Sequence, residues 1–145
     1  MTTSTLPATA LLSLARRGLT EAALTPVPGS RYALAHLAAL RAAAAVLARR
    51  ARPSSDPAVP GAVRRGRPTS AWVLLAGVAP ELSEWAAFFA AGARKRAAAE
   101  AGVTGAVSAR EADDLLRDAS RFLTVVEAAL LAGPGSGFDQ LQASG

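Results

Sequence analysis

Cysteine is absent from this 145-residue sequence, which excludes a disulfide framework, a thiol nucleophile and a metal site built on thiolates. Histidine occurs once, so a histidine-rich metal cluster is excluded as well, and we expect no metal and no cofactor. The longest apolar run, residues 71–79, is far shorter than the about 20 residues that a membrane-spanning helix needs. No basic segment precedes the first apolar residues, so no secretory signal is predicted. We therefore expect a cytoplasmic protein that does not enter a membrane.

Alanine, in contrast, is abundant in the sequence. It makes up roughly a quarter of the chain, well above ordinary usage, and it is the best helix former because it loses no side-chain entropy in a helix. No window shows sustained strand alternation. These observations predict an all-α fold, an up-and-down bundle of four to five helices formed by a single domain over residues 1–132.

Prolines and glycines mark the ends of the predicted helices. Residues 53–68 hold four prolines and two glycines, which predicts a flexible loop, and residues 133–145 are predicted to be a disordered tail. Ser108 and Glu111 form a capping box that starts the last helix. The other helices are predicted at about Leu6 to Leu24, from an N-cap at Ser30 to about Ala51, Ala71–Val78, Pro80 to Ala91, and Ala93 to Ala101.

Apolar residues at helical spacing predict the core. The aromatic run of Trp85, Phe88 and Phe89 is more typical of a core stripe than of a base-stacking surface. The predicted core faces of the three long helices consist of Leu12, Ala15, Leu19 and Ala22; of Ala33, Leu37, Leu40, Ala44 and Leu47; and of Ala112, Leu115, Leu116, Ala119, Phe122, Val126 and Ala129.

The charges suggest two further interpretations. The net charge of +5 and the pI of about 11.2 permit binding to a polyanion. Candidate nucleic-acid-binding residues are Arg64, Arg65 and Arg67 in the proline-rich segment, and Arg94, Lys95 and Arg96 at a helix end; the alternative is solvated charge from an arginine-rich composition. The aspartates 113, 114 and 118 favour ion pairs of Asp113 with Arg117 and of Asp118 with Arg121 over a metal site.

One pair of residues carries catalytic chemistry. His36 is the only side chain that titrates naturally near neutral pH, and Arg31 lies five positions before it. An imidazole can take a proton from a ribose 2′-hydroxyl, and a guanidinium can stabilise the charged phosphorane, so the pair suffices for RNA cleavage without a metal. Positions five apart lie about 140° apart around a helix, so a shared site needs an irregular first turn or a second chain. The alternative is a partly buried histidine bonded to a neighbour.

The stretch RYALAHLAALRAAAAVLARRARP, at residues 31–53, resembles helix-pair segments of HEPN (higher eukaryotes and prokaryotes nucleotide-binding) domains. Residues 70–102 and 107–131 look like a small, stand-alone actinobacterial branch of that family, and the resemblance covers about Leu11 to Leu131. It implies a four- or five-helix up-and-down bundle, often dimeric. Many members are metal-independent ribonucleases of toxin–antitoxin, defence or RNA-processing systems with an R-x(4–6)-H motif, which Arg31 and His36 match. Other members bind or scaffold.

From these observations we predict a non-catalytic module that forms a homodimer and binds a nucleotide, RNA or a protein partner. The alternative is a metal-independent RNase with Arg31 and His36 in its site.

Overall fold

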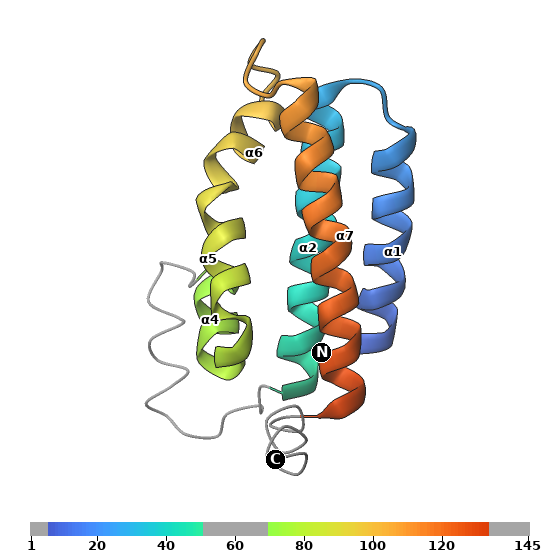
Figure 1. Ribbon diagram of the computed structural model, residues 1–145, viewed down its shortest axis with the longest axis vertical. Helices are drawn as coiled ribbons and strands as arrows, with labels where there is room; N and C mark the ends of the chain where they lie inside the picture. The colour runs from blue at the N-terminus through green and yellow to red at the C-terminus, as the bar shows by residue number, and fades with distance from the viewer. Residues whose placement is uncertain (1–5, 51–69, 134–145) are drawn as a thin grey trace, which may run out of the picture.

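The computed structural model describes residues 6–50 and 70–133 of the chain. Over these ranges the regular structure is entirely helical, so the predicted all-α fold is confirmed. The chain runs alternately up and down through residues 8–24, 28–50, 83–100 and 109–132, and the short helix at residues 71–78 runs opposite to residues 83–91 and packs against them (Figure 1). The predicted flexible loop at 53–68 and, apart from Gly133, the predicted tail at 133–145 lie outside the described residues. The elements are α1 (Ala8–Leu24), α2 (Pro28–Arg50), α4 (Ala71–Val78), the 3-10 helix η1 (Pro80–Leu82), α5 (Ser83–Ala91), α6 (Ala93–Glu100) and α7 (Ala109–Ala132).

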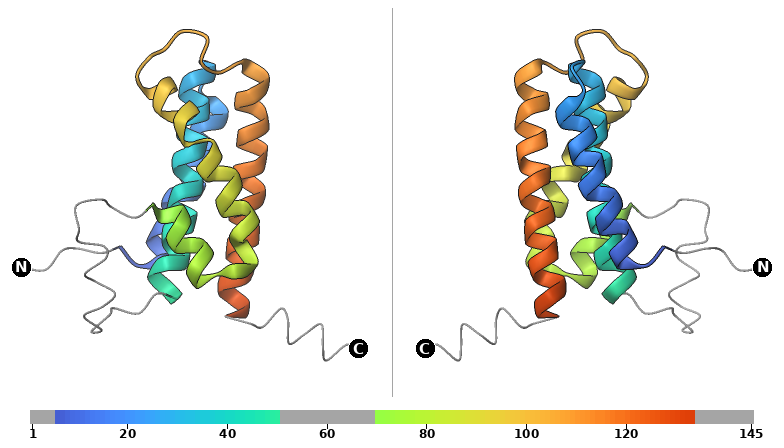
Figure 2. Two further views of the ribbon diagram at one scale, coloured as in Figure 1. Left: turned by 90° about the vertical axis from the view of Figure 1, so that its left-hand side faces the viewer. Right: turned by 90° about the vertical axis from the view of Figure 1, so that its right-hand side faces the viewer.

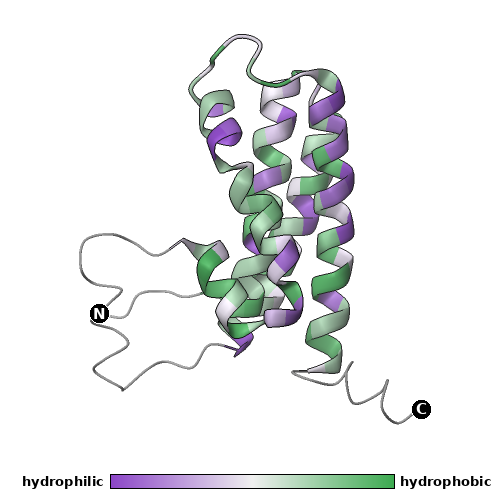
Figure 3. Ribbon diagram, turned by 60° about the vertical axis from the view of Figure 1, so that its left-hand side comes forward, coloured by the Kyte–Doolittle hydropathy of each residue, from purple (hydrophilic) through white to green (hydrophobic). Residues whose placement is uncertain are grey.

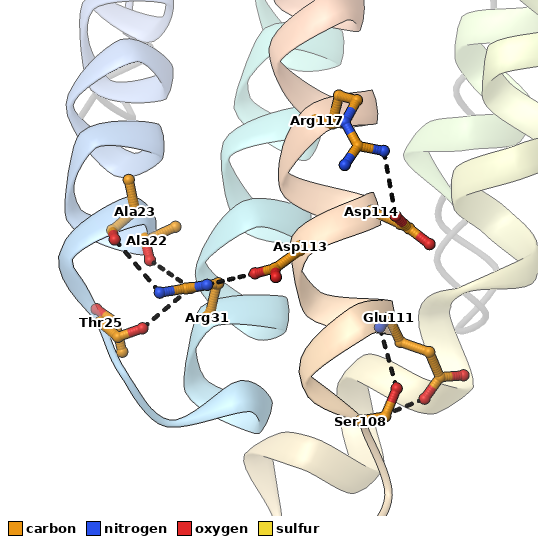
Figure 4. Close-up of polar contacts among 9 residues, drawn as sticks. All are labelled: Ala22, Ala23, Thr25, Arg31, Ser108, Glu111, Asp113, Asp114 and Arg117. Atoms are coloured by element: carbon orange, nitrogen blue, oxygen red, sulfur yellow. Dashed lines mark hydrogen bonds and ion pairs between the residues drawn. The ribbon is translucent and has the colours of Figure 1, made fainter.

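The helix ends follow local rules. Pro80 lacks a backbone donor, and α4 ends at Val78 as predicted, with Ala79 in a non-helical conformation (φ −139°, ψ 74°). The capping box that starts α7 is confirmed: Ser108 Oγ accepts from Glu111 N at 3.0 Å, and the Glu111 carboxylate accepts from Ser108 N at 2.9 Å (Figure 4). The predicted N-cap at Ser30 is wrong. The helix starts at Pro28, because proline suits the first helical turn, where no donor is needed.

Helix α2 lies at the centre of the bundle and packs against α1, α4, α6 and α7 (Figure 2). The predicted core face of α2 is not the most buried one: its residues are only half-buried, although Leu40 packs against the core. Small side chains face the neighbouring helices instead, because they allow a close approach: a Cβ added at Gly18 of α1 would lie 3.4 Å from the Ala38 Cβ. The buried residues of α2 are Tyr32, Ala35, His36, Ala38, Ala39, Ala42, Ala43, Ala45 and Val46.

The larger core side chains come from α4, α5 and α7. The Phe89 ring lies 5.2 Å from that of Trp72 and 5.1 Å from that of Phe122. These rings fill the space between the α4–α5 pair and α7, so the aromatic residues join elements whose backbones are not in close contact. Apolar residues gather on α2, α4 and α5, whereas α6 is largely polar (Figure 3).

By length and composition, α2 is also the one described helix that is long and apolar enough to cross a membrane. Half of its apolar window is buried inside the bundle. The core helix of a soluble bundle meets the same two criteria, because it too is enclosed by apolar surroundings.

Candidate functional site

Arg31 lies in the first turn of α2 and its side chain joins three helices. Its Nε donates to the backbone oxygens of Ala22 at 3.1 Å and Thr25 at 3.0 Å, and a terminal nitrogen donates to Ala23 O at 3.4 Å. Its other terminal nitrogen pairs with the carboxylate of Asp113 on α7 (Figure 4). The C-terminal carbonyls of a helix lack intrahelical donors, so Arg31 supplies them for α1. With 23% of its side chain exposed, the guanidinium is largely occupied by structural contacts.

His36 lies about 1.4 turns further along α2, and it is 1% exposed. Its ring is surrounded by other rings: Tyr32 is stacked at 6.4 Å between centroids, and Trp72 and Phe89 lie edge-on at 5.9 and 6.0 Å. The Nε2 atom lies 2.9 Å from Phe89 O, so Nε2 carries the proton and donates it. The remaining nitrogen, Nδ1, is buried without a hydrogen-bond partner. No solvent-facing nitrogen is left to act as a general base.

The surroundings of His36 favour its neutral form. Burial lowers the pKa of the imidazole below its ordinary value, because a charged ring would lose its hydration. The hydrogen bond to Phe89 O opposes this shift in pKa, Arg96 adds to it, and Glu100 opposes it. The net pKa is lowered, so the ring is held as a neutral donor near neutral pH.

Arg31 and His36 are therefore directed toward different parts of the bundle. Arg31 contacts α1 and α7, whereas His36 contacts α4 and α5. This is the outcome of their 140° separation on a regular helix, since α2 has no irregular first turn. One chain does not bring the two side chains into one site.

The basic run of α6 is partly neutralised. Lys95 pairs with Glu111 of α7, and Arg96 pairs with Glu100 one turn later at 3.1 Å. The bond from Lys95 lowers the pKa of the Glu111 carboxyl below its ordinary value. Arg94 is exposed. The other predicted nucleic-acid-binding residues, Arg64, Arg65 and Arg67, lie outside the described residues.

The aspartates of α7 pair differently from the prediction. Asp113 pairs with Arg31 of α2 rather than with the arginine four residues later on its own helix. That arginine, Arg117, pairs with Asp114 at 3.1 Å. Asp118 forms no ion pair with any described residue, so its predicted pair with the arginine three residues later is wrong as well. Within residues 6–50 and 70–133, no group of three acidic or imidazole side chains could hold a metal ion.

Sequence reasoning missed one surface feature. A hollow of about 320 Å³ lies between α5 and α7 and is lined by Glu84, Trp85, Phe88 and Asp118. The prediction of a buried aromatic stripe holds for Phe89, but Phe88 is 45% exposed. Helical spacing could have predicted this exposure. Phe88 lies three residues after Trp85 but directly before Phe89, and residues next to each other in a helix point about 100° apart, so Phe88 cannot share the buried face of Phe89.

A family model described as HEPN-like matches residues 22–127 of the chain. The match starts at the end of α1 and includes α2, the helices from α4 to α6 and most of α7. The chain belongs to the HEPN family. The predicted HEPN resemblance is thereby confirmed, and the up-and-down helical bundle is the HEPN-like fold that it implied. Searches of the curated proteins and of the solved structures find no match to this HEPN chain.

Proposed function

We propose that this HEPN domain is a non-catalytic binding module of the cytoplasm. The observation that carries the proposal is the burial of its only histidine. His36 has its one donor bonded to Phe89 O, and its other nitrogen faces the protein interior. A general base must come within hydrogen-bond reach of the proton that it removes. In this arrangement a ribose hydroxyl cannot reach the imidazole unless the aromatic core opens.

The alternative, a metal-independent RNase in a toxin–antitoxin or defence setting, requires two rearrangements. Arg31 would leave the C-terminal carbonyls of α1 and the Asp113 carboxylate. His36 would leave the rings of Trp72 and Phe89. A second chain that brings its own Arg31 does not remove the second requirement, because the histidine stays buried. Binding therefore fits this chain better than cleavage.

The binding unit in this proposal is a homodimer, and its ligand is a nucleotide, RNA or a protein. Of the basic run in α6, Lys95 and Arg96 already have carboxylate partners, which weakens their attraction for phosphate. Arg94 stays available. Light scattering at micromolar concentration tests the dimer: the mass of two chains supports it, and the mass of one chain contradicts it.

The test of function is incubation of the purified chain with mixed RNA and EDTA. The proposal predicts RNA of unchanged length with the wild type. Arg31→Ala and His36→Gln preparations, with Arg17→Ala as a matched exposed arginine control, identify any contaminating nuclease, because it cleaves equally in every preparation. Cleavage by the wild type and Arg17→Ala, but not by folded Arg31→Ala and His36→Gln, would establish the RNase and reject the binding module.

A further inference from the structure

A second hollow lies beside the one between α5 and α7. Next to the 320 Å³ hollow lies a smaller one of about 160 Å³, and Phe88 lines both. The smaller hollow is bordered by Tyr32, Lys95, Glu111 and Leu115. Both hollows lie where α5 and α6 face α7, one on either side of Phe88, and we call the two together the α5–α7 groove. Its larger part is within the size range of ligand pockets.

Phe88 gives the groove an apolar centre held in place by the core. One side of its ring packs edge-on against Phe89, with 5.0 Å between centroids. The other side is open to solvent, and the half-buried Trp85 lies beside it on the same wall. Phe89 in turn packs against Phe122 of α7 at 5.1 Å. An exposed aromatic ring with a rigid base is the kind of side chain that anchors protein interfaces.

Two carboxylates flank this apolar centre without a cation. Glu84 lines the groove from the first turn of α5, and Asp118 lines it from α7. Neither has an ion-pair partner in the part of the chain that the structure describes, whereas Glu111 at the other end is paired with Lys95. The chain as a whole carries a net charge of +5. The larger hollow therefore has a local charge opposite to that of the protein.

We propose that the α5–α7 groove binds a basic amphipathic helix of a partner protein. A helix lays its apolar face into such a groove with anchors at helical spacing. Apolar side chains of the partner would pack on Phe88 and Trp85. An arginine of the partner would lie between Glu84 and Asp118, where its planar guanidinium can bond to carboxylates and stack on an aromatic face. This inference rests on the proposed binding function and names its partner class.

Charge decides against nucleic acid as the occupant. A phosphate backbone would approach the unpaired carboxylates of Glu84 and Asp118, and like charges across an interface suppress wrong partners. A protein helix can instead offer cations and apolar side chains together. It would also cover the seam where the backbones of α5 and α7 make few contacts, as a further helix of the bundle would.

The probe is a displayed library of helical peptides about four turns long, randomised on one face and selected for binding to the full wild-type chain. The selected peptides are expected to combine leucine, isoleucine or phenylalanine with arginine on the same face. Amide chemical shifts of the full chain then locate the best peptide, with changes expected in α5, around Lys95 of α6 and in the first half of α7, and none in α1.

Variants test separately what the two carboxylates and the Phe88 ring contribute to binding. The double variant Glu84→Gln/Asp118→Asn should weaken the best peptide about tenfold or more, because bonds to charged groups are lost. Phe88→Ala should also weaken it about tenfold or more, as expected for an aromatic anchor. The matched controls are Glu21→Gln, an exposed carboxylate of α1, and Val73→Ala, an exposed apolar residue of α4, and both should bind like the wild type. Unchanged circular dichroism shows that each variant is folded.

Several results overturn the proposal. They are selected peptides without basic residues, binding that survives both groove variants, shift changes confined to residues that do not border the groove, or a labelled RNA oligonucleotide that binds the groove. A library that yields no binder also overturns it. None of these outcomes contradicts the proposed function. That function is contradicted by RNA cleavage by the wild type, which is measured separately.

Discussion

Replacing His36 with alanine separates a structural histidine from a catalytic one. The substitution empties a site that is 1% exposed and bordered by the rings of Tyr32, Trp72 and Phe89. Large-to-small changes in a packed core cost about 2–5 kcal/mol because a cavity remains. The lost hydrogen bond adds little, because Phe89 O keeps the Gly92 amide as a donor at 3.1 Å. We expect a loss of about 3 kcal/mol in the free energy of unfolding.

Urea denaturation followed by circular dichroism measures this loss. His36→Gln is the matched variant: it keeps a donor and part of the volume, so it should lose less stability than His36→Ala. A catalytic histidine at a solvent-filled site would show the opposite pattern, with stability unchanged in both variants. A change below about 0.5 kcal/mol in His36→Ala, which is typical of surface substitutions, would refute the packing described for this residue.

Three further predictions follow from local geometry and charge. Gly92→Ala places a Cβ 2.8 Å from the Tyr32 hydroxyl, and this overpacking should lower the free energy of unfolding by about 1–3 kcal/mol. Its control is Gly77→Ala, whose Cβ meets no atom within 4 Å and which should be neutral or slightly stabilising; thermal melts measure both variants. Ser108→Ala removes the cap of α7 and should cost about 1 kcal/mol of unfolding free energy, and no loss would contradict the capping box. The pKa of His36 is lowered in the folded state, so on acidification the unfolded chain takes up a proton before the folded chain does. The free energy of unfolding should therefore be highest above about pH 7, and it should fall as the pH drops below about 6.5 toward the folded pKa. Denaturation midpoints across this range should show a smaller slope in His36→Gln, and an equal slope in both proteins would contradict the assignment.

Local rules predicted the parts of this fold that depend on neighbouring residues. The break before Pro80 and the capping box of Ser108 and Glu111 are examples, because each is a hydrogen-bonding problem settled within a few residues. The aromatic residue Phe89 was also placed correctly in the core, since its apolar spacing repeats along the helix.

The face of α2 was not predictable in the same way. Apolar spacing assigned leucines such as Leu37 and Leu40 to the core, and the helix is nearly apolar all round, so its pattern does not distinguish one face. Contacts with four other elements decided the outcome, and small residues such as Ala38 and Ala42 took the closest positions. These contacts join residues far apart in the sequence, which periodicity does not encode.

The candidate site shows the same division. The separation of Arg31 and His36 around the helix follows from the 3.6-residue repeat, and it predicted that one chain would not bring them together. The partners of each residue could not be predicted, because Asp113 and Phe89 lie on other helices. The exposure of Phe88 could have been read from its spacing, because it cannot share one helix face with Phe89. The groove beside Phe88 could not, because its other wall comes from α7 and depends on how the aromatic residues pack.

The central claim is that His36 is a buried, neutral, structural residue, and nuclear magnetic resonance of its ring tests this most directly. Because the chain has one histidine, its imidazole signals are assigned without ambiguity. We predict a neutral ring with the proton on Nε2, slow exchange of that proton with water, and no titration between about pH 8 and pH 6.5. A ring that titrates with an ordinary midpoint near 6.5 and exchanges rapidly with solvent would contradict the account, because it would leave His36 free to act as a general base.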